Sequence, residues 1–295
     1  MKHLNFVLNK KIILVIIYSV YSISSALAQI NNHTITGLID ADNYLQTLIA
    51  KKGVNQGFIE ISDTTAIDFK PGPVNLLSYY QNTENNTSLL SWQIATATIA
   101  KSGDFGITTG PYVISKKENA ELFYGNYLYV WRSNKKKKWQ LILHANIPCP
   151  KLYLVNQTKI VEPFDSKYSL LLGPKKIKMR EDIVFSTDEL LGKALKISGN
   201  KSLTEFYSAN VALNLAGCQP LNGIEEVLPF IASQKITIQS SPTHTNRAYS
   251  GDLAYTYGKA ILTFKKKPKT YSYIRIWQIQ PDMKWYIIMD AYLPL

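Results

Sequence analysis

The fold is decided by a stretch that this chain contains twice, GDFGITTGPY at residues 103–112 and GDLAYTYG at residues 251–258. Each copy is followed by a strand-like segment, YLYVW at 127–131 or YIRIW at 273–277. A second such segment comes next, KWQLILHANIP at 138–148 or KWYIIMDAYLP at 284–294. The copies are offset by 148 residues at the Gly-Asp pair and by 146 at the tryptophans. A fixed period of this size indicates one module written twice, each as long as an ordinary domain.

Helices are expected ahead of the strands in both modules. Leu45, Leu48 and Ile49 recur at helical spacing, and apolar residues occupy the same frame 146 residues later. The run STDE at 186–189 has the capping hydroxyl and early acids of a helix start, so a helix is predicted to begin there. Helices first and strands after predict an α+β fold, with helices laid against one curved antiparallel sheet in each module.

Large side chains alternate on both faces of the strand at 127–131. A strand that is apolar on both sides is typical of a sheet covered on both faces. We therefore expect helices on one face and a partner on the other. The partner is either the second module, which would make an intramolecular pseudo-dimer, or another subunit.

The first 28 residues are predicted to be a signal peptide. Lysines at 2, 10 and 11 precede an apolar centre at 12–20 and an Ala-Leu-Ala end at 26–28. The predicted organisation is a signal peptide (1–28), a first module (29–150), a linker (151–181) and a second module (182–295). The chain is expected to be exported to a periplasm or to the outside, with no integral membrane span after cleavage.

Charge and ligand-type residues exclude several classes of function. The formal net charge is +12, but the lysine runs at 135–138 and 265–267 lie between expected strands and read as hairpin tips, so no nucleic-acid partner is predicted. Cys149 and Cys218 are either bridged across the modules or unpaired, and the sequence leaves both open. The histidines are scattered, so neither a metal site nor a cofactor is expected.

The repeated stretches also carry a family resemblance. The string from Ser102 to Tyr112, with Tyr127 to Trp131 and Trp139 after it, resembles the nuclear transport factor 2-like superfamily, in its secreted branch called domain of unknown function 4440. The resemblance implies two cone-shaped modules, each with a pocket at the wide end, and a bacterial envelope protein. Ketosteroid isomerase, scytalone dehydratase and polyketide cyclases of that superfamily use the pocket for acid-base chemistry, whereas other members only bind or dimerise.

The candidate site residues follow from the repeat. Asp104 and Asp252 follow glycines between strands, which favours hairpin turns over catalysis. His144 and Asp290 share one position on the last strand of the two modules, where a partly buried titratable group can act as a general base. Aromatic residues on the strand faces are expected to line a ligand pocket, namely Tyr112, Tyr127, Tyr129, Trp131, Tyr255, Tyr257, Tyr273 and Trp277.

Three functions are compatible with these residues. The first is binding of a small apolar or aromatic ligand in a cone pocket. The second is an isomerase, dehydratase or cyclase acting in the second module, with Asp290 as base and Tyr255 or Tyr257 as hydrogen-bond donor. The third is a non-catalytic interaction protein whose pockets are filled by its own side chains. Fold alone does not choose among them, and whether the protein is an enzyme stays open.

Overall fold

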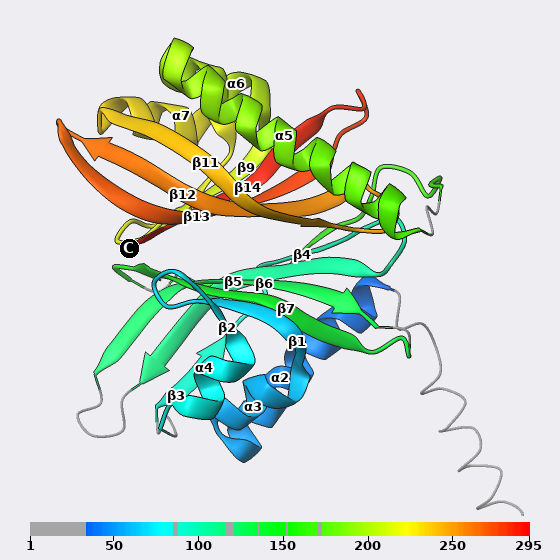
Figure 1. The fold of residues 1–295 in the computed structure, drawn as a ribbon. Coiled ribbons are helices and arrows are strands. Elements are labelled where there is room, and N and C mark those ends of the chain that lie inside the picture. Colours follow the sequence, from blue (N-terminus) through cyan, green and yellow to red (C-terminus); the bar gives the residue numbers. More distant parts are fainter. Residues whose placement is uncertain (1–33, 85–87, 116–120, 135, 152, 170–172) are drawn as a thin grey trace, which may run out of the picture. The chain divides into compact units, whose positions relative to one another are not determined.

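The computed structural model describes residues 34–84, 88–115, 121–134, 136–151, 153–169 and 173–295, which belong to one compact unit. The predicted signal peptide lies outside these residues. The described chain forms two α+β modules in which each sheet carries its own helices, as predicted (Figure 1).

The first module begins with two helices and continues into an eight-stranded sheet of order β2-β1-β7-β6-β5-β4-β8, with β3 paired to β5. The sheet is mixed, because β1 pairs parallel with β7 and β4 pairs parallel with β8. The expected antiparallel pairing holds for the other strand pairs of this sheet. The elements are α2 (Ile35–Lys52), α3 (Val54–Ile61), β1 (Ser62–Phe69), β2 (Pro73–Asn75), α4 (Leu76–Asn82), β3 (Leu89–Trp92), β4 (Thr96–Ile99), β5 (Phe105–Ser115), β6 (Leu122–Ser133), β7 (Trp139–Cys149) and β8 (Lys159–Val161).

The second module repeats this order in a six-stranded sheet, β10-β9-β14-β13-β12-β11, again with a parallel pair, β14 and β9. One long strand, β11, stands where the first module has β3 and β4. The elements are α5 (Pro174–Ser198), the 3-10 helix η1 (Gly199–Ser202), α6 (Leu203–Phe206), β9 (Tyr207–Leu215), β10 (Leu221–Asn222), α7 (Ile224–Ser233), β11 (Ile236–Arg247), β12 (Leu253–Phe264), β13 (Lys267–Ile279) and β14 (Trp285–Pro294).

Helix α5 begins earlier than predicted. It starts at Pro174, so the helix start expected at 186–189 is wrong, and α5 begins inside the expected linker. Proline suits the first helical position, because the backbone N–H that it lacks has no partner there. The lysine-rich stretch after Pro174 forms the exposed first turns. The run at 186–189 instead lies within the helix, where Asp188 is fully buried.

Each sheet has one face covered by helices and another that packs against the opposite sheet. On the helix side lie two separate clusters, one for each module. A third cluster combines side chains of both modules between the sheets. The ring centroids of Phe69 and Tyr257 lie 5.5 Å apart there, and those of Phe105 and Tyr255 lie 6.2 Å apart.

The two Gly-Asp turns contact each other reciprocally. Gly103 and Gly251 have φ values of 66° and 78°, which favour glycine, so both stretches are turns as predicted. The Ser102 N–H donates to Ser250 Oγ at 3.1 Å, and the Ser250 N–H donates to Ser102 Oγ at 3.0 Å. The duplicated Ser-Gly-Asp sequence therefore joins one module to the other.

The structure also bears on the cysteines, on one lysine-rich hairpin tip and on membrane-spanning helices. Cys149 and Cys218 are free thiols, so the bridged alternative does not hold. Lys265 and Lys266 form an exposed turn between β12 and β13, as expected of a hairpin tip. Within the described ranges, no helix combines the length and apolar character needed to cross a membrane.

Candidate functional site

The interior of the first module is centred on a buried carboxylate, Asp42 of α2. Its oxygens accept hydrogen bonds from Trp92 Nε1 at 2.5 Å, Thr108 Oγ1 at 2.5 Å and Tyr127 Oη at 3.2 Å. Burial raises the pKa of Asp42 to about 6, although these three hydrogen bonds act in the opposite direction. The cluster connects the helix layer to the sheet, and Asp42 is fully enclosed.

His144 lies in the same interior and is also fully buried. Its Nδ1 is 2.7 Å from Asp68 Oδ1, and its ring packs 4.6 Å from Phe58 and 5.2 Å from Tyr129. Burial acts to raise the pKa of Asp68, but the His144 imidazole and the nearby Lys70 ammonium lower it below its ordinary value. An aspartate that orients a histidine is an arrangement that general-base catalysis also uses. Here, however, packed rings surround the histidine.

The interior of the second module is centred on Arg275 of β13, which lies between two carboxylates. Arg275 Nη1 forms an ion pair with Asp188 of α5, and Nε lies 3.4 Å from both carboxylate oxygens of Asp290. All three side chains are fully buried. Burial acts to lower the pKa of Arg275, but the two carboxylates raise it well above its ordinary value. The guanidinium therefore stays charged and neutralises part of the acidic charge around it.

Asp290 is further held by two phenols. Tyr207 Oη and Tyr292 Oη donate to Asp290 Oδ2 at 2.8 and 2.9 Å. Burial raises the pKa of Asp290, and the charge of Arg275 opposes that rise. A general base has to reach a substrate proton directly or through one water. The contacts of Asp290 are all internal, so this geometry favours a structural network.

The predicted ligand-binding aromatics fall into two groups. One group is buried on the helix-facing sides of the sheets, in the module interiors. The structure does not bring Tyr255 or Tyr257 to Asp290, because both lie on the opposite face, packed between the sheets. The helix-facing group comprises Tyr112, Tyr127, Tyr129 and Trp131 in the first module and Tyr273 and Trp277 in the second.

A β-bulge in each last strand explains which side chains share a face. Strict alternation places His144 with Ile142, and Asp290 with Ile288. The pairing register shifts between Val130 and Trp131, and again at the equivalent point of β13, so one residue is inserted at each site. The bulge returns His144 and Asp290 to the helix side, while Ile142 and Ile288 pack between the sheets.

The buried acids of the helices, Asp42 and Asp188, were not predicted from the sequence. Asp42 and Asp188 are 146 residues apart, each three positions before a buried leucine of the helix repeat. An acid at the same place on two apolar helix faces was the available signal. Each acid accepts a hydrogen bond from an equivalent tyrosine, Tyr127 at 3.2 Å and Tyr273 at 2.9 Å.

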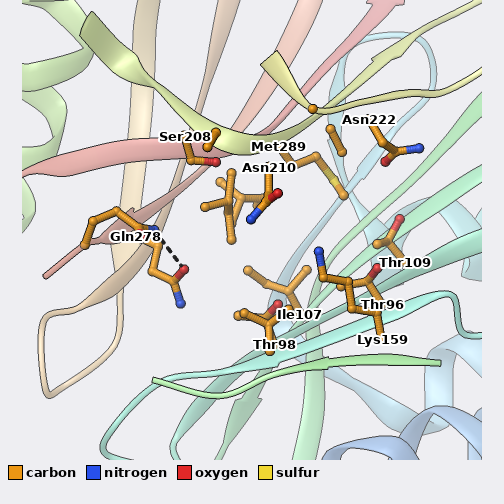
Figure 2. A pocket seen from close by; sticks show the side chains of 17 residues that line it. Thr96, Thr98, Ile107, Thr109, Lys159, Ser208, Asn210, Asn222, Gln278 and Met289 are labelled. Atoms are coloured by element: carbon orange, nitrogen blue, oxygen red, sulfur yellow. Dashed lines mark hydrogen bonds between the residues drawn. The ribbon is translucent and has the colours of Figure 1, made fainter. Parts of the chain in front are cut away.

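A cavity of about 490 Å³ lies between the two sheets (Figure 2). Strands β4, β5 and β8 line it from the first sheet, and β9, β10, β13 and β14 line it from the second. Its volume falls within the range of small-molecule sites and equals the liquid volume of roughly 16 waters. Lys159 and Asn210 line it and are exposed, so the cavity reaches the surface.

Both apolar and polar side chains line this cavity. Ile107 from one sheet and the paired Ile276 and Met289 from the other form apolar walls. Gln278 lies toward one end, as Figure 2 shows. Ser208 is only 9% exposed, yet its Oγ has no hydrogen-bond partner in the described part of the chain.

The repeat explains why this space is open. Where the first module has Ile107 and Thr109, the second has Tyr255 and Tyr257, 148 residues later. On that side of the repeat, the Tyr257 ring packs 5.0 Å from the His244 ring. Ile107 and Thr109 are smaller than Tyr255 and Tyr257, so they leave open a volume that the tyrosines fill at the equivalent place in the second module.

Two further lining positions follow the same pattern. Thr96 is equivalent to His244, and Gln278 is equivalent to Arg132. Arg132 extends into the opposite module, where it donates to Asn246 Oδ1 at 2.6 Å. Thr96 and Gln278 line the cavity. His244 and Arg132 fill the equivalent space on the other side of the repeat with a larger ring and a guanidinium.

Within the residues that the structure describes, no group of three or more His, Cys, Asp or Glu side chains is placed to hold a metal ion. Neither His144 nor Asp290 lines the cavity. The available chemistry of the cavity is therefore hydrogen bonding by hydroxyls and amides, one ammonium group and apolar contact.

No protein-family model matches this sequence, and no curated protein matches it. Several solved structures are similar to part of it. An NTF2-like protein from Cytophaga hutchinsonii has 15% identity and a TM-score of 0.33, over 39% of this chain and 97% of its own. An NTF2-like protein with a cystatin-like fold from Novosphingobium aromaticivorans has 9% identity and a TM-score of 0.32, over 41% and 85%. The S. rosetta CaMKII hub has 18% identity and a TM-score of 0.30, over 42% and 99%. At these values the likeness supports no conclusion about activity.

Proposed function

We propose that this protein is a non-catalytic binding protein that holds a small amphipathic molecule in the cavity between its two sheets. The observation that carries the proposal is the 490 Å³ volume itself. It lies where the first module has Ile107 and Thr109 in place of the tyrosines of the second. The exposed Asn210 amide supplies a hydrogen-bonding group on its wall.

This proposal moves the ligand from the module interiors to the space between the modules. The interiors are packed with fully buried side chains, among them Tyr129, Trp131 and Trp277. Arg275 fills the equivalent position of Tyr129 in the second module and is bound on both sides by carboxylates. A ligand in either interior would have to displace these groups and leave charges unpaired, which is unfavourable.

Acid-base catalysis has less support from the geometry. Asp290 and His144 are both fully buried and bound to internal partners. The cavity is lined by neither of them. The enzyme hypothesis would regain support if Asp290→Asn abolished a measured turnover while the variant stayed folded.

The proposal also includes the arrangement and location of the chain. We take the two modules to form an intramolecular pseudo-dimer of nuclear transport factor 2-like modules, a view supported by the reciprocal contacts of Ser102 and Ser250. We take the chain to be exported after cleavage before Gln29, on the strength of the first 28 residues. A mature N-terminus at Gln29, found by sequencing the exported protein, would test the second part.

The function is tested by native mass spectrometry of the exported protein, recovered without refolding. We expect a mass excess that disappears on denaturation. Ile107→Tyr installs the residue of the second module and should abolish the excess. The matched control is Tyr255→Ile, the reciprocal change on the related side, which should keep it. Ala212→Leu narrows the cavity from the opposite wall and replaces Ile107→Tyr if that variant does not fold.

Two results would overturn the proposal. One is a wild-type protein at its bare mature mass. The other is a mass excess that survives in a folded filling variant, because the ligand would then lie elsewhere. In the first case the filled interiors favour an interaction protein.

A further inference from the structure

We infer that the ligand of this cavity is an amphipathic organic anion, and that the segment between the modules supplies the cation that binds it. This inference rests on the proposed function, and it deepens that proposal by naming a ligand class. It also assigns a role to residues that have no counterpart in the repeat.

In the described part of the chain, the cavity wall carries one positively charged side chain and no negatively charged one. Lys159 is the one charged side chain among the residues that line it in the described part of the chain. The other polar groups are hydroxyls and amides, such as those of Thr98, Asn210 and Gln278, and they all include hydrogen-bond donors. A wall with one ammonium, several neutral donors and no carboxylate suits an anionic group.

Strand pairing places Lys159 in line with Thr96 and with Thr109, whose hydroxyl already donates to the Tyr127 carbonyl at 2.6 Å. The Lys159 N–H donates to the Ala95 carbonyl at 2.8 Å, and β8 runs parallel to β4 with Lys159 opposite Thr96. Thr96 is in turn opposite Thr109 of β5. Paired residues share a face of a sheet, so the three side chains form one polar row, as Figure 2 also shows. No ion pair of Lys159 occurs with another described residue within 4.0 Å.

The segment that carries Lys159 is anchored to the first module on both sides of it. Thr158 Oγ1 donates to the Ile94 carbonyl at 2.7 Å. Further along, Asp165 forms an ion pair with Lys101 at 2.6 Å, and the Lys101 ammonium lies 4.1 Å from the Phe164 ring centroid. The stretch is therefore a structured part of the cavity wall.

The rest of the cavity requires an apolar body on the ligand. Ile107, Ile276 and Met289 offer apolar surface away from the polar row. A small inorganic anion would leave this surface in contact with water and would fill little of the 490 Å³. A carboxylate on an aromatic or aliphatic body would use both parts of the wall.

The test compares two probes with the same body and different charge, 2-naphthoate and 2-naphthalenemethanol. Their affinities for the wild-type protein are measured by titration calorimetry at low and at physiological salt. Lys159→Met removes the ammonium. Lys167→Met is the matched control, because it removes the same formal charge from an exposed lysine of the same segment that does not line the cavity.

We expect 2-naphthoate to bind the wild-type protein and to bind Lys159→Met about tenfold more weakly, the lower end of what charge-assisted hydrogen bonds contribute. The loss should shrink at higher salt, because Lys159 is exposed. Lys167→Met should bind 2-naphthoate as wild type does. The neutral probe should bind all three proteins equally.

Three results would overturn the anion inference: equal affinity of 2-naphthoate for wild type and Lys159→Met, an equal loss for both probes, or no binding of 2-naphthoate to the wild-type protein. The proposed function is judged separately. If the neutral probe binds wild type and is excluded by Ile107→Tyr, the cavity remains a binding site and only the charge of its ligand is wrong.

Discussion

Replacing Arg275 by methionine should strongly destabilise the second module. The guanidinium is fully buried and is the cation between Asp188 and Asp290. It also donates to Ser240 Oγ at 3.1 Å and to Tyr292 Oη at 3.1 Å. Methionine preserves much of the aliphatic volume but none of these bonds. Two buried carboxylates would then lie in one interior without a counter-charge.

The magnitude follows from the burial of the pair. Removing one partner of a buried ion pair costs about 3–5 kcal/mol, because the remaining charge is left uncompensated. In the variant, burial still raises the folded pKa of Asp290 above its unfolded value and the opposing charge of Arg275 is gone, so the folded state binds more protons. The unfolding free energy of the variant should therefore fall as pH rises, and the deficit against wild type should shrink toward pH 4.

Urea denaturation of both proteins from pH 4 to pH 8 measures this effect. Lys178→Met is the control, since its ion pair with Asp182 is 66% and 57% exposed and should contribute less than about 1 kcal/mol. A deficit below about 1 kcal/mol at pH 7.5 would refute the reasoning, as would a large deficit that does not change with pH.

Three further predictions concern the core and the contact between the modules. The folded pKa of Asp42 is about 6, so the unfolding free energy of wild type should fall by about 3 kcal/mol between about pH 4 and 6, and Asp42→Asn should lack this fall. A difference in unfolding free energy between the two proteins that does not change with pH would contradict this. Ser102→Ala and Ser250→Ala should each lower the unfolding free energy by about 1 kcal/mol. Because the two hydroxyls contact each other, the effects should not add in a double-mutant cycle, and additive effects would refute the reciprocal contact. Gly110→Ala should cost about 1–3 kcal/mol by thermal unfolding, because a Cβ there would lie 2.0 Å from the Gln93 carbonyl oxygen, and a neutral result would contradict that close approach.

The repeat made the architecture predictable. Residues equivalent by offset occupy equivalent elements, as the Trp131 and Trp277 side chains show. Their Nε1 atoms donate to Thr108 and Thr256 at 2.9 and 2.8 Å. Period-two patterning identified the long strands because it reflects which side chains meet a core. The helix order and the coverage of both sheet faces followed from the same reasoning.

The faces of the last strands were not predictable from alternation. A bulge inserts one residue and reverses the pattern beyond it, and nothing in the residues around Ile142 or Ile288 marks that insertion. The start of α5 was missed for a different reason. Residues 151–181 were assigned to a linker, whereas Pro174 within them is suited to the first turn of a helix.

The cavity could not be predicted from the sequence, because it depends on which space remains unfilled when the two sheets pack together. The exchange of Ile107 for Tyr255 was visible in the repeat. Its meaning required knowledge that this face meets the other module and not the helices. The role of Lys159 needed one more tertiary fact, since a three-residue strand in a connecting segment has no periodicity to detect.

The most direct test of these conclusions is a crystal structure of the protein as purified from its native source, without refolding. We predict electron density for a small molecule between Ile107 and Ile276, with its acidic group beside Lys159. Density beside Asp290 or His144 in a module interior would contradict the account. So would a cavity that holds only ordered water in protein whose native mass shows no bound molecule.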